Sequence, residues 1–224
     1  MSMDHDVSSV PGDIEAEIDE KLERAIADLD ETIRLNPNDA LYFCRRARTN
    51  RLLGRAELAM NDYNRAVELD PTGPEPLLGR GNLYTELGDY LRAIADYDAA
   101  IRLNKSDYGS YTVRGEAYTQ LGDFTRAIRD FDKALDIEPD SLWAYWSRAY
   151  AHYSARDFLS AIRDWDEIIR LDPEESVAFG YRAQAYTAAG KDQEAQKNAT
   201  KAMALGLDKE SLDSMLDKAR ERPR

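Results

Sequence analysis

The sequence predicts an all-α protein that folds as a right-handed α-solenoid of antiparallel helix pairs. The first observation is a fixed period of 34 residues, because recurrence at such a spacing is the signature of a repeat architecture. Pro37, Pro71, Pro139 and Pro173 mark the period, and Lys105 occupies the remaining place. The second is that each repeat holds two segments with apolar residues at spacings of three and four, the stripe of an amphipathic helix. The third is an alternation of small and large apolar residues that suits closely packed helices.

The composition is that of a folded protein with an acidic surface. Of the 224 residues, 43% are hydrophobic and 33% are charged, so the chain can bury a sizeable core. The formal net charge of -13 disfavours partners that are themselves negative, such as nucleic acid phosphates or anionic lipid. We therefore expect no nucleic acid and no membrane among the partners.

The cysteine content and the N-terminus bear on the cellular compartment. Cys44 is the single cysteine, which excludes an intrachain disulfide and cannot supply a thiolate metal cluster by itself. The N-terminus is acidic and polar, unlike a signal peptide, and no run approaches the roughly 18 apolar residues of a membrane span. These observations predict a cytoplasmic protein with no cofactor and no metal.

The chain begins with a segment that lacks apolar periodicity. Residues 1–12 mix Ser, Asp, Gly and Pro, so we interpret them as flexible. Residues 13–39 hold one amphipathic helix from Asp13 to Leu35, which ends at Pro37 because proline cannot continue a helix. This helix is a leading half repeat that we expect to cap one end of the stack.

Five full repeats and a closing helix follow. Each repeat contains two helices, and the last repeat is degenerate because Ala199 replaces its large aromatic residue. The repeats span residues 40–73, 74–107, 108–141, 142–175 and 176–208. In residues 209–224, a single apolar stripe of Leu212, Met215, Leu216 and Ala219 predicts a helix that caps the other end.

The turn between the two helices of a repeat carries a characteristic pair of residues. Glycine fits the end of the first helix because it adopts a left-handed conformation without steric cost, so Arg156, which replaces it once, is expected to fit less well. The aspartate that follows suits the start of the second helix, where a carboxylate meets unpaired backbone N–H groups. These residues are Gly54, Gly88, Gly122 and Gly190, and Asp89, Asp123, Asp157 and Asp192.

Small and large residues occupy fixed positions that predict the core. Small residues let the two helices of a repeat approach closely, and large aromatic residues fill the space between successive pairs. The small residues are Ala47, Gly81, Gly115, Ala149 and Ala183 in the first helices, and Ala59, Ala93, Ala127, Ala161 and Ala195 in the second helices. The large residues are Tyr63, Tyr97, Phe131 and Trp165.

These repeats resemble the tetratricopeptide repeat (TPR) family. The family places an aromatic, a small residue, Tyr, Ala, an aromatic, Ala and Pro at set positions, which in repeat 108–141 are Tyr111, Gly115, Tyr118, Ala127, Phe131, Ala134 and Pro139. The resemblance covers roughly residues 22–207. It implies that the first helices line a concave groove and that ligands, usually peptide segments, lie in that groove.

Arginine stands where the family usually has leucine in all five full repeats, at Arg46, Arg80, Arg114, Arg148 and Arg182. The second helices carry a carboxylate at one repeat position, from Asp28 to Asp164, and Asn198 in the last repeat. If each Arg pairs with the Asp of the preceding repeat, all five arginines and all five aspartates have a partner. We therefore predict a structural ladder between repeats, for example Arg114 with Asp96, rather than ligand contacts.

The sequence contains no recognisable catalytic arrangement. His5 lies in the N-terminal segment, and His152 lies at a helix position that is tyrosine in other repeats. Neither histidine stands in a metal-binding or hydrolase motif, and the glycines occur singly at turns rather than in a phosphate-binding loop. We predict that the protein is not an enzyme and that His152 is a packing substitution.

The groove positions that the resemblance implies are basic in the first full repeat, at Arg45, Arg48 and Arg51. Three guanidinium groups on one helix face repel each other, and a nearby negative group is needed to offset this repulsion. One possibility is an acidic peptide or a C-terminal carboxylate held by bidentate contacts. The other is the acidic leading helix, through Glu23, Asp30 or Glu31.

The later groove positions are polar and then aromatic. Asn82 and Glu116 belong to the polar middle. The aromatic positions are Trp143, Trp146, Tyr150, Tyr153 and Tyr181. Aromatic residues are enriched at binding hot spots, so they predict a pocket for an apolar or aromatic ligand group, and the alternative is ordinary core packing and self-association.

We therefore predict a non-catalytic scaffold that binds a peptide or partner protein in its groove, with an acidic or aromatic-containing segment as the ligand. The alternative is a structural module that forms a homo-oligomer through the degenerate last repeat and the closing helix. Chaperone-binding family members hold a C-terminal carboxylate with Lys, Asn and Arg side chains. That set is not reproduced, because the matching residues are Cys44, Arg48, Gly79, Gly109 and Val113.

Overall fold

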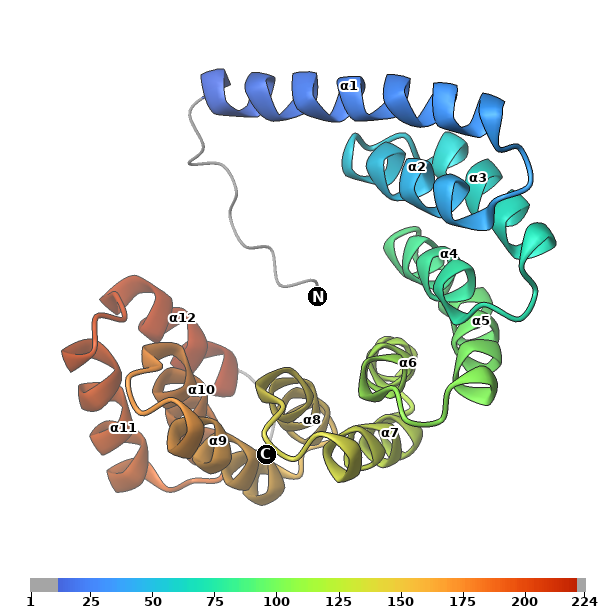
Figure 1. Cartoon of the computed structure of the whole chain (residues 1–224). Coiled ribbons are helices and arrows are strands. Elements are labelled where there is room, and N and C mark those ends of the chain that lie inside the picture. Colours follow the sequence, from blue (N-terminus) through green and yellow to red (C-terminus); the bar gives the residue numbers. More distant parts are fainter. Residues whose placement is uncertain (1–11, 221–224) are drawn as a thin grey trace. The chain divides into compact units, whose positions relative to one another are not determined.

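The computed structural model describes residues 12–220, which form twelve α-helices and no strand (Figure 1). The all-α prediction is therefore confirmed. The predicted flexible segment, apart from Gly12, lies outside the described residues, as do His5 and residues 221–224. The helices divide into two compact units, residues 1–106 and residues 107–224, which we call the N-terminal unit and the C-terminal unit.

The N-terminal unit contains the leading helix and two helix pairs. Helix α2 packs on α3 and α4 packs on α5, while α1 contacts α2 and α3 contacts α4. The bounds are α1 Gly12–Leu35, α2 Ala40–Leu52, α3 Ala56–Leu69, α4 Pro74–Glu86 and α5 Tyr90–Leu103. The predicted starts of the first helices, Ala40 and Pro74, agree with the structure, and the leading helix begins one residue earlier than expected.

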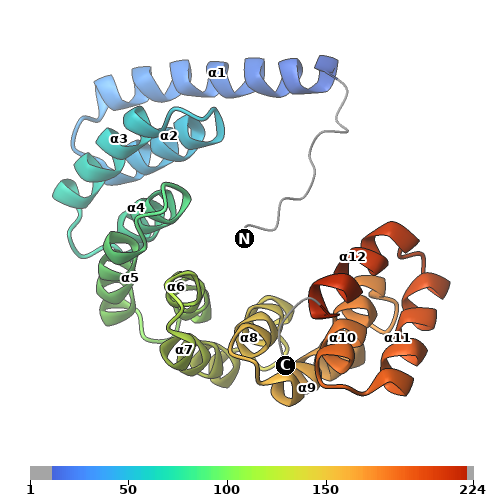
Figure 2. The ribbon, with the colours of Figure 1, turned by 180° about the vertical axis from the view of Figure 1, so that it is seen from behind.

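The C-terminal unit contains three helix pairs and the closing helix. The pairs are α6 with α7, α8 with α9 and α10 with α11, and Figures 1 and 2 both show α12 alongside α10. The bounds are α6 Tyr108–Gln120, α7 Phe124–Ile137, α8 Leu142–Ser154, α9 Phe158–Leu171, α10 Ser176–Ala188, α11 Asp192–Ala204 and α12 Lys209–Arg220. Each first helix starts at the predicted residue.

The turn residues behave as their chemistry predicts. The four turn glycines have φ between 70° and 77°, and Arg156 has φ of 66°, the only positive value for a non-glycine residue in the described part of the chain. The side chain of Asp123 accepts a hydrogen bond from the backbone N–H of Arg126 at 3.0 Å, and Asp89 and Asp157 cap their helices in the same way. Asp192 differs, because it is the first residue of α11 rather than the cap.

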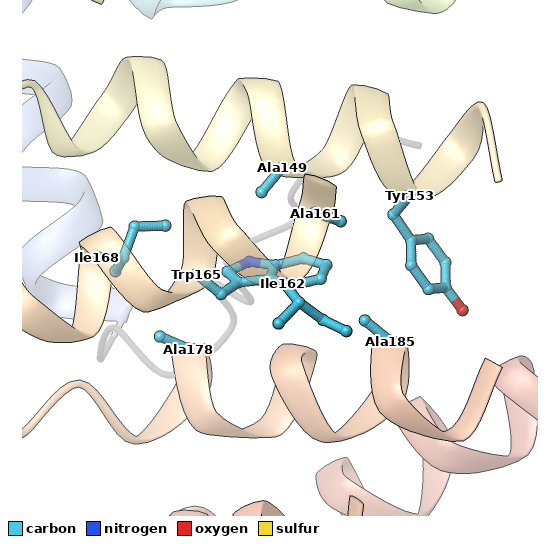
Figure 3. Close-up of a cluster of buried hydrophobic side chains, with 8 residues drawn as sticks. All are labelled: Ala149, Tyr153, Ala161, Ile162, Trp165, Ile168, Ala178 and Ala185. Atoms are coloured by element: carbon cyan, nitrogen blue, oxygen red, sulfur yellow. The ribbon is translucent and has the colours of Figure 1, made fainter. Parts of the chain in front are cut away.

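The cores combine the predicted small and large residues. In the C-terminal unit, Trp165 of α9 is only 2% exposed and lies between α8 with Ala149 and α10 with Ala178 (Figure 3). A Cβ atom added to Gly115 would lie 2.6 Å from Cε1 of Phe131, so a larger residue would force the ring to move. Close packing thus explains why these positions hold Gly or Ala.

The arginine ladder pairs differently from the prediction. In four repeats the Arg donates Nε and Nη2 to the aspartate sixteen positions later in its own repeat, with Nε–Oδ2 distances of 2.8 to 3.0 Å. The pairs are Arg46 with Asp62, Arg80 with Asp96, Arg114 with Asp130, and Arg148 with Asp164. In the last repeat, Arg182 donates Nε to Oδ1 of Asn198 at 2.8 Å. The prediction was wrong because this face of the second helix meets its own first helix.

A link between repeats does exist, but through another residue. The remaining nitrogen, Nη1, donates to the preceding repeat at a position two residues after the predicted one. The contacts are Arg46 with Asp30, Arg80 with Asn64, Arg148 with Asp132, and Arg182 with Asp166. Each of these arginines therefore ties three helices together, and the predicted partner Asp28 is exposed.

Candidate functional site

The basic positions on α2 are only partly engaged. Arg51 forms an ion pair with Glu86 of α4, whereas Arg45 and Arg48 are exposed and form no ion pair with the described side chains. The three acids proposed as their partners on α1 are bound by other arginines. Glu23 pairs with Arg55, Asp30 with Arg46 and Glu31 with Arg34. Pairing with these three acids is therefore not what balances Arg45 and Arg48.

Asn82 on α4 takes part in an internal hydrogen-bond network. Its Oδ1 accepts from the hydroxyl of Tyr97 at 2.8 Å, and the same hydroxyl lies 3.0 Å from Oγ1 of Thr85. Because Tyr97 is nearly fully buried, this network orients Asn82 on a half-buried surface.

Glu116 on α6 binds two side chains of the following repeat. Its Oε1 accepts hydrogen bonds from Nε1 of Trp143 at 2.6 Å and from Oγ of Ser147 at 2.7 Å, both on α8. Burial raises the pKa of Glu116 above its usual range, and the two hydrogen bonds act in the opposite direction. The sequence placed Glu116 and Trp143 in the groove but did not predict that their side chains bond, because the contact spans two repeats.

Trp143, Trp146 and Tyr150 recur on α8 at spacings of three and four, and Trp146 contacts Tyr181 of α10. We call these four residues the aromatic face. Trp143 is 42% exposed and Tyr150 is 39% exposed. Trp146 meets Tyr181 edge to face with ring centroids 5.7 Å apart. Tyr181 in turn stacks on the buried Trp165 at 5.9 Å, so the core holds this face in place.

Tyr153 does not belong to the aromatic face. It is 5% exposed and packs against Trp165 and Phe158, with centroid distances of 6.2 and 5.4 Å (Figure 3). At about 100° per residue, Tyr153 lies about 80° around α8 from Trp143 but only about 20° from Trp146, so its burial follows from its packing against Phe158 and Trp165 of α9. The aromatic residues of α8 that recur at spacings of three and four therefore lie partly on an exposed side of the helix and partly in the core.

Helix α12 covers the end of the predicted groove. Gln184 of α10, three residues after Tyr181, is 5% exposed and donates Nε2 to the backbone oxygen of Met215 at 2.8 Å. A Cβ atom at Gly180 would lie 3.0 Å from Sδ of Met215, which shows how closely α12 approaches α10. The open part of the surface in this unit therefore ends at Tyr181.

Cys44, the single cysteine, has a thiol that ionises only at high pH. Burial, together with the nearby carboxylates of Glu75, Asp70 and Asp62, raises the pKa of the Cys44 thiol to about 12, so the thiolate is not populated at neutral pH. Within residues 12–220, no three His, Cys, Asp or Glu side chains gather as metal ligands. No helix in the same range combines the length and apolar character needed to cross a lipid bilayer.

Comparison with known proteins identifies the family. A profile described as tetratricopeptide repeat matches residues 78–141 and 147–200, and one described as TPR repeat matches residues 47–88. The chain belongs to the tetratricopeptide repeat family, whose members are generally non-catalytic scaffolds for protein interactions. A search of curated proteins gave no match.

Solved structures with the same fold include three that illustrate its range. YrrB, described as a TPR protein with an unusual peptide-binding site, is 18% identical with a TM-score of 0.69, covering 87% of this chain and 98% of YrrB. MamA from Desulfovibrio magneticus is 18% identical with a TM-score of 0.68, covering 82% and 97%. A tetratricopeptide repeat protein from Parabacteroides merdae is 22% identical with a TM-score of 0.67, covering 89% and 93%.

Proposed function

We propose that this protein is a non-catalytic scaffold that binds an extended peptide segment of a partner protein along the first helices of its repeats. The observation that supports this most is the aromatic face, where the large rings of Trp143 and Tyr150 remain exposed on α8. Large aromatic side chains lose little conformational entropy on binding and bury much area, so they act as anchors for a ligand. The peptide-binding site in the description of YrrB accords with this proposal.

The basic end offers a second contact of different chemistry. Arg45 and Arg48 are exposed and lie three residues apart on α2, so both can reach one acidic side chain or carboxylate. We propose that an acidic group of a ligand binds there. The net charge of -13 makes nucleic acid or an anionic membrane an unfavourable partner for the molecule as a whole.

A selection from a displayed library of random 12-residue peptides tests the proposal. Peptides recovered on the wild-type protein should bind the Trp143→Ala/Tyr150→Ala variant at least tenfold more weakly, because the variant loses both anchors. The matched control is Leu91→Ala, a change at a side chain that is 72% exposed on a second helix. Binding that survives loss of both aromatics would contradict the role of the aromatic face.

The alternative function, self-association through the C-terminal end, has less support. The apolar stripe of α12 is already used within its own unit, since Leu212 is 2% exposed and Ala219 is 6% exposed. Little apolar surface of this helix then remains for a second copy. Sedimentation over a hundredfold range of concentration separates the two functions, because a monomer throughout excludes self-association as the main role.

A further inference from the structure

Glu116 differs from the other shielded carboxylates of the chain. The buried Asp62, Asp96 and Asp164 each receive an arginine of their own repeat at hydrogen-bond distance. The half-buried Glu116 receives only two neutral donors, the indole N–H of Trp143 and the hydroxyl of Ser147. Among the described side chains, no cation pairs with it.

A shielded carboxylate without a cation is energetically unfavourable. Removing a charge from water costs free energy that neutral hydrogen bonds offset only in part, and the raised pKa of Glu116 is the same cost expressed as a proton affinity. The two donors fix the orientation of the carboxylate without neutralising it. The site is therefore arranged for a positive charge that the described chain does not provide.

The neighbouring aromatic ring completes such a site. Elsewhere in the C-terminal unit, an aromatic ring and a carboxylate hold an arginine between them, with the guanidinium carbon 4.4 or 5.6 Å from the ring centroid. These groups are Arg126 with Tyr118 and Asp123, and Arg148 with Tyr145 and Asp164. Trp143 and Glu116 form a similar pair of ring and carboxylate, and tryptophan is the aromatic residue that attracts cations most strongly.

We infer that a lysine or arginine side chain of the bound peptide binds at Glu116, with its cation at the carboxylate and against the exposed ring of Trp143. This inference rests on the proposed peptide-binding function and gives its ligand a chemical requirement. It also revises the expectation of a purely apolar or aromatic ligand group at this end of the chain. The net charge of -13 also attracts a positively charged peptide to the molecule.

The recovered peptides provide the first test. Lys and Arg should be enriched at least tenfold over the input library in peptides selected on the wild-type protein, and this enrichment should be absent on Glu116→Gln. The amide keeps the oxygen that accepts from Trp143 and Ser147 but removes the charge, so it isolates the electrostatic contribution. For one selected peptide, replacing its basic residue by norleucine should lower the affinity at least tenfold for wild type and by less than twofold for Glu116→Gln.

A measurement without any ligand accompanies this test. At pH 7, Glu116→Gln should unfold at the same temperature as wild type or a higher one, because it removes an uncompensated charge, whereas Asp164→Asn should unfold at a lower one. Selected peptides that depend on Trp143 but show no basic preference would overturn the inference and leave the proposed function standing. If no peptide is recovered, both fall.

Discussion

Arg156 adopts a backbone conformation that favours glycine, at the turn where the other full repeats have that residue. A left-handed conformation costs a non-glycine residue about 1–2 kcal/mol, and the greater freedom of glycine in the unfolded chain offsets about 0.4–1 kcal/mol of this. We expect Arg156→Gly to stabilise the protein by about 0.5–1 kcal/mol in urea denaturation. Arg156→Ala is the control, because it removes the same side chain and keeps the strain. Equal stabilities of the two variants would contradict the prediction.

His152 should make stability depend on pH. Burial lowers the pKa of His152, against the opposite influence of Asp164 and Asp157, while Arg148 lowers it and Asp132 raises it. In the unfolded chain the pKa is about 6.5, so the unfolded state binds the proton first as pH falls. The contribution of the neutral histidine is therefore present above about pH 6.5 and is lost as pH falls through the lower folded value.

The comparison that isolates this effect is His152→Tyr, which introduces the residue found at Tyr84, Tyr118 and Tyr186. We expect the unfolding temperature of wild type to decrease more steeply than that of the variant between pH 7.5 and 5.5. Circular dichroism melting curves at intervals of half a pH unit measure both slopes. Equal slopes for the two proteins would mean that protonation of His152 does not contribute to the pH dependence of stability.

At the scale of the helix pair, the arginine forks join the two helices of a repeat to the second helix of the preceding repeat. Arg80 binds Asp96 on α5 and Asn64 on α3, and the Asp96 side chain is only 9% exposed. Arg80→Met should destabilise the protein by about 2 kcal/mol, somewhat less than for a fully buried pair, because it leaves Asp96 without its cation. Urea denaturation monitored by circular dichroism measures this loss.

The double variant Arg80→Met/Asp96→Leu is the informative companion. Replacing both charged residues by apolar ones removes the unpaired carboxylate, so most of the lost stability should return. The single variant Asp96→Leu completes the comparison. If the double variant loses as much free energy of unfolding as the two single variants together, the fork stabilises the fold by more than balancing charge.

The helices could be predicted from sequence because their limits depend on local chemistry. Pro37 and Gly54, for example, end helices for reasons that involve only the backbone near them. The partner of Arg114 could not be predicted, because the repeat position of Asp96 or Asp130 does not say which neighbouring helix its side chain meets. The bond between Glu116 and Trp143 was missed for the same reason, since it depends on how far α8 lies from α6.

The spacing of the aromatic residues on α8 was only partly informative. It predicted one surface for Trp143, Trp146, Tyr150 and Tyr153, and three of these do reach the aromatic face. Tyr153 faces the core because the packing of α9 decides where the surface ends. Similarly, the sequence showed that α12 is amphipathic, but only the structure shows that it covers Gln184.

At the scale of the molecule, each unit is a stack in which a repeat is stabilised mainly by its neighbours. The last repeat lacks a following repeat, and α12 takes over part of that role. Leu212 of α12 packs with Ala183 and Ala199 of this repeat, which lacks the large aromatic residue present in the earlier ones. The stability of α10 and α11 should therefore depend on a helix that is not part of their repeat.

Truncation after Asp208 tests this dependence. Loss of α12 should expose Ala183 and Ala199 and leave Gln184 without its acceptor, so α10 and α11 should lose order together with the deleted helix. Hydrogen exchange should then show faster exchange of amides in α10 and α11, with little change in α6 and α7, and truncation after Arg220 serves as the control. If amides in α10 and α11 keep their protection, the last repeat is stable on its own pair contacts, and α12 only covers the surface beyond Tyr181.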